Sequence, residues 1–145
     1  MMSLEENKAI VCRVWDEVVS RGTLGVADEL IAPEFIYHAP GTPELHGPDG
    51  FAQLIAMYRA AFPDLQATVE DLIAEGDKVV SRYTVRGTHQ GELMGIPRTG
   101  RRVTEAGIVI SRLADGKLVE DWHSPDTLGL LQQLGAIPPL GPSGS

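Results

Sequence analysis

The sequence is poor in cysteine, since Cys12 is the only one among its 145 residues. A single thiol excludes a disulfide within the chain and is typical of a reducing compartment, so we expect a cytoplasmic location. Cys12 lies in a helical apolar pattern with Val11, Val14 and Trp15. A free cysteine in such a pattern usually behaves as a small hydrophobic residue, so we interpret Cys12 as a packed or bystander thiol and not as a nucleophile.

Positive charge is scarce as well. The chain has twelve Lys and Arg but twenty Asp and Glu, which gives a formal net charge of −8, and the acidic residues are spread along the chain. Such a surface repels polyanions, so we expect no nucleic acid partner. The first ten residues lack the basic and apolar regions of a signal peptide, and no apolar run approaches the ~20 residues that span a bilayer. We therefore expect no membrane partner.

Sequence motifs for metal, nucleophile and phosphate chemistry are missing. The chain has no HExxH, no clustered set of Cys and His, no GxSxG turn and no glycine-rich loop between a strand and a helix. The glycines of GELMGIPRTG lie instead in a connection between two strands, where they are turn residues. We expect neither a metal nor a cofactor.

The patterns that are present change from helical to strand-like along the chain. Ser3 and Glu6 form a capping-box signature, after which apolar residues recur at helical spacing. Helices are expected over residues 4–21, 24–31, 48–62 and 127–134. Strands are expected over residues 35–37, 66–75, 78–89, 101–113 and 117–124, with a Pro/Gly-rich loop over residues 38–48. Helices followed by a four-stranded antiparallel meander predict an α+β fold, with one domain over residues 1–138 and a mobile tail over residues 139–145.

Two of the expected strand connections carry turn signals. Gly76-Asp77 and Asp115-Gly116 are pairs suited to tight hairpin turns. In the strand after the first turn, period-two alternation places Tyr83, Val85 and His89 on the same inward, apolar face.

The last expected strand carries the leading site candidate, His123. If its odd-numbered residues face inward, Asp121 and His123 share one face with Val119, and Asp121 could orient or charge the imidazole. The opposite phase would bury Leu118 and Trp122 instead. Imidazole has an unperturbed pKa of about 6.5, so His123 would shuttle protons near neutrality.

Asp126 immediately precedes the last expected helix, TLGLLQQL. At that position it is a natural N-cap, whose carboxylate accepts backbone N–H groups. The alternative is a catalytic carboxylate that anchors His123 from three residues away.

Other polar and aromatic residues are candidates for substrate binding. Each has an ordinary structural alternative: a core aromatic, a loop-capping histidine, or a hydrogen-bonded edge histidine. Glu105 has the parity of Val103 and Val109 and would be a buried carboxyl group with a raised pKa if it faces inward. The candidates are Trp15, Tyr37, His38, Tyr58, His89 and Glu105.

Three segments carry a resemblance to a known family: AFPDLQATVEDLIAEGDKVVSRYTVRGTHQGELMGIPRTGRRV, DGKLVEDW and DTLGLLQQLGAIP. Over residues 5–138 the chain resembles the SnoaL-like polyketide cyclases, or ester cyclases, of the nuclear-transport-factor-two-like superfamily. The resemblance implies a cone-shaped curved antiparallel sheet that is covered by N-terminal helices and encloses a cavity. It also implies a homodimer, formed through the open face of the sheet.

In the cyclases of this family, an aspartate near the end of the last strand drives an intramolecular aldol ring closure without metal or cofactor. With Asp126 aligned as the helix-initiating aspartate, the catalytic position falls on His123. A histidine that those cyclases carry on the third long strand falls near Val109. Both departures from the family pattern weaken the case for an aldol reaction specifically, whereas the cavity and a general acid/base group are retained.

The expected function is cofactor-independent acid/base chemistry on a small hydrophobic, oxygenated substrate, of cyclase or isomerase type. One alternative is a non-catalytic binding protein, which a wholly apolar pocket with a solvent-facing His123 would favour. Another is a limonene-type epoxide hydrolase, which needs an Asp-Arg-Asp set in the cavity. Arg82 and Arg86 are expected to face outward, which disfavours this second alternative.

Overall fold

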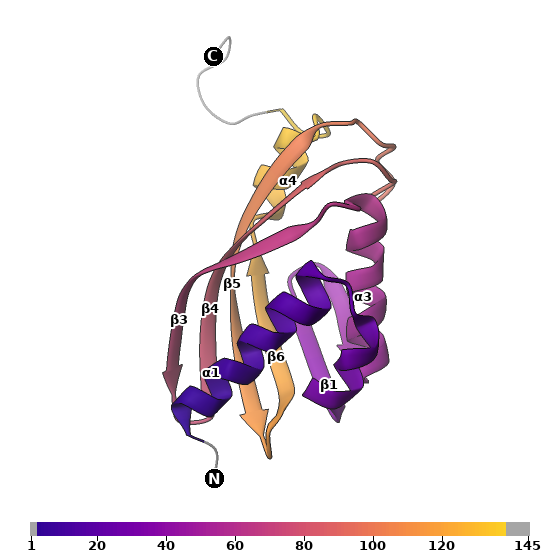
Figure 1. Ribbon diagram of the computed structural model, residues 1–145. Helices are drawn as coiled ribbons and strands as arrows, with labels where there is room; N and C mark the ends of the chain where they lie inside the picture. The colour runs from indigo at the N-terminus through magenta and orange to yellow at the C-terminus, as the bar shows by residue number, and fades with distance from the viewer. Residues whose placement is uncertain (1–2, 139–145) are drawn as a thin grey trace.

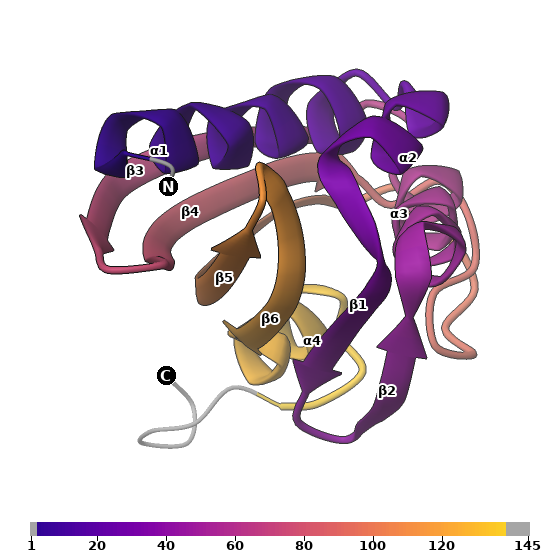
Figure 2. The same ribbon diagram turned by 90° about the horizontal axis from the view of Figure 1, so that it is seen from below.

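The computed structural model describes residues 3–138 and confirms the α+β class. The expected mobile tail at residues 139–145 lies outside the described residues. The strands form one six-stranded sheet in the order β2-β1-β6-β5-β4-β3. Figures 1 and 2 show that the sheet curves strongly, that α1 lies across β3 and β4, and that α3 lies beside β1 and β2. The helices and the curved sheet together surround the interior of the cone.

The helical segments have the following bounds: α1 (Leu4–Arg13), η1 (Val14–Ser20), η2 (Leu24–Val26), α2 (Ala27–Leu30), α3 (Gly47–Ala61) and α4 (Thr127–Gln133). The strands are β1 (Ile31–Ala39), β2 (Thr42–His46), β3 (Gln66–Glu75), β4 (Lys78–Thr88), β5 (Arg102–Ala114) and β6 (Lys117–Pro125). The four-stranded meander predicted from the sequence is therefore β3 to β6.

The first helix begins as predicted and then changes its hydrogen bonding. Ser3 and Glu6 form both bonds of the capping box. From Val14 onward the helix is a π-helix, η1, instead of the continuous α-helix expected over residues 4–21. Arg59 of α3 stabilises its end by donating hydrogen bonds to the carbonyl oxygens of Val19 and Ser20, at 2.9 and 2.8 Å. Short π-helical segments are frequent at functional sites.

The segment between Leu24 and His46 differs most from the prediction. The expected second helix is only a 3₁₀ turn and one α-helical turn, because the chain enters β1 at Ile31. Pro33 lies within β1, where the pairing with β6 is irregular, and such an irregularity tolerates a residue without an N–H. The predicted loop contains the edge strand β2, which pairs with β1.

The pairing of β1 with β6 could not be read from local patterns, because the two strands are parallel and far apart in sequence. This pairing extends the meander and places Tyr37 opposite Asp121 and His38 opposite Trp122. It therefore brings residues from both ends of the chain to one cavity.

Both hairpin turns are confirmed. Glu75 pairs with Lys78 across Gly76-Asp77, and Ala114 pairs with Lys117 across Asp115-Gly116. Asp115 and Gly116 both have positive φ, as the tight primed turn requires.

Candidate active site

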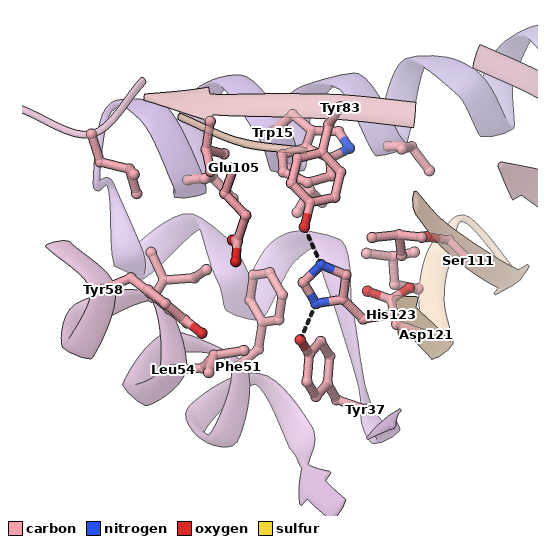
Figure 3. Close-up of a pocket in the computed structure, with 18 residues that line it drawn as sticks. Trp15, Tyr37, Phe51, Leu54, Tyr58, Tyr83, Glu105, Ser111, Asp121 and His123 are labelled. Carbon is pink, nitrogen blue, oxygen red and sulfur yellow. Dashed lines mark hydrogen bonds between the residues drawn. The ribbon is translucent and has the colours of Figure 1, made fainter. Parts of the chain in front are cut away.

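A cavity lies between η1, α3 and the inner face of the curved sheet (Figure 3). Aliphatic and aromatic side chains form most of its wall, and polar groups gather on the sheet side. The polar and aromatic residues that line it are Trp15, Tyr37, Phe51, Tyr58, Tyr83, Glu105, Ser111, Asp121 and His123. A largely apolar cavity with a few convergent polar groups is the usual form of a small-molecule site.

His123 lies on the inner face of β6 with both ring nitrogens hydrogen-bonded. Nδ1 bonds to the hydroxyl of Tyr37 from β1, and Nε2 bonds to the hydroxyl of Tyr83 from β4 (Figure 3). A neutral imidazole has one N–H donor and one acceptor nitrogen. One phenol therefore donates to the ring, while the other accepts from it and keeps its own O–H proton free to donate elsewhere.

The imidazole of His123 is neutral at physiological pH. Burial lowers its pKa from 6.5 to about 4, because the apolar surroundings disfavour the charged form. Titration of His123 near neutrality, expected from the sequence, is therefore wrong. Burial also raises the pKa of Tyr37 and of Tyr83, so both phenols keep their protons.

Tyr83 lines the cavity and bonds to His123, a position that the sequence reasoning did not identify although the parity of its strand predicts that it faces inward. Its ring contacts Trp15 of η1, with 4.6 Å between the ring centroids. The cross-strand partner of Tyr83 is Gly107 of β5. A Cβ atom at position 107 would overlap the Tyr83 hydroxyl, so glycine is the residue that lets this ring cross β5 and reach His123.

The inward phase of β6 is confirmed for Asp121 and His123, while Trp122 is 37% exposed on the other face. Leu118 also lines the cavity, contrary to simple alternation. The reason is a bulge: the pairing with β5 moves from Arg112↔Glu120 to Leu113↔Leu118, so β6 has one extra residue there.

Asp121 is a buried carboxyl group, 5% exposed, opposite Ser111 of β5. Burial raises its pKa to about 7, and the neighbouring Ser111 hydroxyl acts in the opposite direction. Its Oδ1 atom has no hydrogen-bond partner among the described residues. Asp121 was expected to orient His123, which is wrong because the tyrosines occupy both ring nitrogens.

Asp126 caps α4, as its position before the helix predicted. Its side chain accepts the backbone N–H of Gly129 at 3.0 Å. It is not among the residues that line the cavity, and its alternative role as an anchor of His123 is wrong for the same reason as for Asp121.

Glu105 faces inward, as its parity indicated, and is 8% exposed. Burial raises its pKa to about 7, and the negative charge of Asp126 adds to this increase. Tyr58 of α3 lines the same cavity, and burial raises the pKa of its phenol. Trp15 and Tyr58 are thus placed in the wall as expected.

The placement of His38 in the cavity is wrong. Because neighbouring residues of a strand face opposite sides and Tyr37 faces inward, His38 faces outward. Its Nε2 lies 2.6 Å from an Oε2 atom of Glu120, and its ring stacks on Trp122.

The placement of His89 in the cavity is also wrong. The residue is fully buried just beyond the end of β4, against Phe62, and is not part of the cavity wall. Its Nδ1 accepts the backbone N–H of Thr99 at 3.2 Å, so His89 holds the loop that leads to β5.

Residues 3–138 contain no group of three or more His, Cys, Asp or Glu side chains arranged to hold a metal ion. In the same range, no helix has the length and apolar character needed to cross a bilayer. The described residues that line the cavity include Glu105 and Asp121 but neither Lys nor Arg.

Comparison with known proteins decides the family. The family model described as SnoaL-like polyketide cyclase matches residues 9–134. The chain belongs to the SnoaL-like polyketide cyclase family. This confirms the resemblance recognised in the sequence, and with it the cone-shaped fold.

Curated relatives of the same family carry cyclase names. The chain is 38% identical to aklanonic acid methyl ester cyclase DauD of Streptomyces sp. strain C5, over 70% of this chain and 68% of that protein. It is 37% identical to nogalonic acid methyl ester cyclase of Streptomyces nogalater, over 74% and 82%. Among solved structures, AclR from Streptomyces galilaeus is 34% identical, with a TM-score of 0.84 over 96% of this chain and 87% of that one.

Proposed function

We propose that the protein is a cofactor-independent cyclase that closes a ring in a polyketide-derived methyl ester by an intramolecular aldol reaction. The observation that carries the proposal is His123, a neutral imidazole held by two phenols on the wall of a largely apolar cavity. The names of the curated relatives supply the substrate class. His123 also occupies the position that the resemblance assigns to the acid/base group.

The reaction requires one proton acceptor that later becomes a proton donor. A ring nitrogen of His123 removes a proton from a carbon activated by neighbouring carbonyl groups, which leaves an enolate. The enolate carbon attacks a ketone carbonyl of the same molecule, the new C–C bond forms, and the resulting alkoxide takes the proton from the imidazolium. Product and substrate are isomers, so no co-reactant is needed.

The depressed pKa of His123 fits this sequence of steps. An enolate beside the ring is an opposite charge, which favours the imidazolium and raises the pKa during the reaction. When substrate carbon replaces one phenol at the ring, that phenol is free to donate to the substrate carbonyl oxygen. Tyr37 and Tyr83 are thereby hydrogen-bond donors to the developing charge.

The charge of the cavity supports an esterified substrate. Two carboxyl groups, Glu105 and Asp121, line the described wall, which has neither Lys nor Arg to pair with a substrate carboxylate. Burial of an unpaired carboxylate is strongly unfavourable, whereas a methyl ester is neutral. We therefore propose that the methyl ester is cyclised in preference to its free acid.

Product analysis tests the function. Aklanonic acid methyl ester and its free acid are incubated separately with the protein, and the products are separated by chromatography and weighed by mass spectrometry. The proposal predicts a product of unchanged mass and altered retention from the ester alone. An ester that is recovered unchanged would contradict it.

The alternatives expected from the sequence receive less support. A pure binding protein does not need an imidazole and two phenols converging in an apolar wall. An epoxide hydrolase of the limonene type needs an arginine in the cavity, whereas Arg82 pairs with Asp71 at 2.6 Å where both side chains are more than half exposed.

We also propose a homodimer and a cytoplasmic location. Ile108 and Ile110 of β5 and Trp122 of β6 are large exposed apolar side chains on adjacent strands of the outer sheet face. A second copy of this face is the natural cover for them, and light scattering at micromolar concentration tests this. The exposed thiol of Cys12 supports a reducing compartment.

A further inference from the structure

A second polar group faces the cavity at a distance from His123. Glu105 lies four residues before Val109, the cross-strand partner of His123, so the two positions are separated by about 13 Å along β5. Figure 3 shows the Glu105 carboxyl group pointing into the cavity beside the Phe51 ring, with the imidazole of His123 on the other side of that ring. It makes no hydrogen bond with the described residues.

The surroundings of Glu105 favour its neutral form. The titratable groups that face the cavity around it are the phenols of Tyr37, Tyr58 and Tyr83, the imidazole of His123 and the carboxyl group of Asp121. Asp126 adds a negative charge from the start of α4. Arg86 of β4 borders a small adjoining pocket, but its side chain is exposed and bonds to Thr68.

A neutral carboxyl group in this position is a donor without an acceptor. Buried polar groups are nearly always hydrogen-bonded, so one that faces an otherwise apolar cavity is suited to a ligand atom. The O–H of a carboxylic acid requires an acceptor such as a carbonyl oxygen. Polyketide-derived esters carry several carbonyl oxygens.

We propose that the Glu105 carboxyl group donates a hydrogen bond to a carbonyl oxygen of the substrate, on the side of the cavity away from His123. The proposal deepens the proposed cyclase function, on which it rests, by adding a second contact that fixes how the substrate lies. Ionised Glu105 has no proton to donate and repels the oxygen. Binding of a carbonyl compound therefore weakens as Glu105 ionises, with its pKa of about 7.

A simple pair of ligands tests the contact without any cyclisation. 1-Tetralone has one carbonyl oxygen and no second carbonyl group to attack, and tetralin has the same ring system without the oxygen. Trp15 lines the cavity, so its fluorescence reports binding once the other tryptophan is removed by Trp122→Phe on the outer face. Dissociation constants are measured from pH 6 to pH 8.

The expected affinity for 1-tetralone falls about tenfold between pH 6 and pH 8, because about a tenth of Glu105 is protonated at pH 8. Glu105→Gln keeps a donor that cannot ionise, so it binds 1-tetralone as the unsubstituted protein does at pH 6 and shows no fall. Glu105→Leu binds about tenfold more weakly at pH 6. Asp121→Asn, which removes the other buried carboxyl group, retains the fall. Tetralin binding does not change with pH.

Three results would overturn the proposal. The first is an affinity for 1-tetralone that falls equally between pH 6 and pH 8 in Glu105→Gln. The second is a pH-dependent fall in this affinity that disappears only in Asp121→Asn. The third is an equal affinity for 1-tetralone and tetralin at pH 6. The proposed function is judged separately, by turnover of aklanonic acid methyl ester. Failure of one test therefore does not decide the other.

Discussion

Replacing Asp121 by Asn should stabilise the protein at neutral pH. The pKa of Asp121 rises from its ordinary 3.8 to about 7 in the folded state because the carboxyl group is buried. A difference of one pKa unit between the folded and unfolded states corresponds to about 1.4 kcal/mol. Ionisation of Asp121 therefore lowers the free energy of unfolding by about 4 kcal/mol above pH 7. This decrease begins at about pH 4, where the unfolded chain starts to ionise, and is complete near pH 7.

Urea denaturation at pH 4, 5, 6, 7 and 8 measures the effect. The free energies of unfolding of the two proteins should be similar at pH 4 and diverge by about 1.4 kcal/mol per pH unit up to pH 7, with Asp121→Asn the more stable. Curves that remain parallel over this range would refute the argument that burial keeps Asp121 neutral.

Asp64 is a matched control with the opposite sign. Its carboxylate accepts the backbone N–H of Thr88 at 2.7 Å and the Thr88 hydroxyl at 2.8 Å, and these bonds lower its pKa. Its contribution to stability is present above the ordinary pKa and is lost as the pH falls through the lowered value. Asp64→Asn should therefore lower the free energy of unfolding by the same amount at every pH from 5 to 8, so the slope of that free energy against pH does not change.

Three further predictions concern the site and its supports. Gly107→Ala should displace the Tyr83 hydroxyl and lower kcat at least tenfold, whereas Gly25→Ala, which has open space around it, should not; equal kcat values would remove the positioning role of Gly107. Asp126→Ala should lower the free energy of unfolding by about 1 kcal/mol and leave turnover intact; an unchanged melting temperature with lost turnover would make the carboxylate catalytic. Turnover should fall at acid pH as His123 is protonated near pH 4, and a fall centred at pH 6.5 would contradict burial of the ring.

Local patterns predicted most of the fold, and nonlocal contacts explain what they missed. The β3–β4 hairpin is predictable because its two signals, period-two alternation and a two-residue turn, are both found in one continuous stretch of sequence. The parallel pairing of β1 with β6 has no local signature, because it depends on how helices pack between distant segments. The end of η1 is bonded by Arg59 of α3, a residue that lies outside the sequence of the helix itself.

The candidate site was predictable only in part for the same reason. Parity along β5 and β6 grouped Glu105 with Val103 and Val109, and His123 with Asp121, but left open which phase faces inward; the structure has both residues in the cavity wall. The partners of His123 come from β1 and β4, so identifying Tyr37 and Tyr83 as its hydrogen-bond partners required the order of strands in the sheet. The expectation that His38 faces the cavity was wrong because the sequence does not show which face of β1 points inward. Knowing that the neighbouring Tyr37 faces inward would have been enough to place His38 on the outer face.

Turnover of aklanonic acid methyl ester by His123→Asn tests the central claim most directly. His38→Asn is the matched control, since that imidazole lies outside the cavity wall. Loss of one general acid/base group should lower kcat by ~10²–10⁴-fold in His123→Asn, measured on protein that circular dichroism shows to be folded, while His38→Asn retains turnover. Full turnover in His123→Asn would contradict the account.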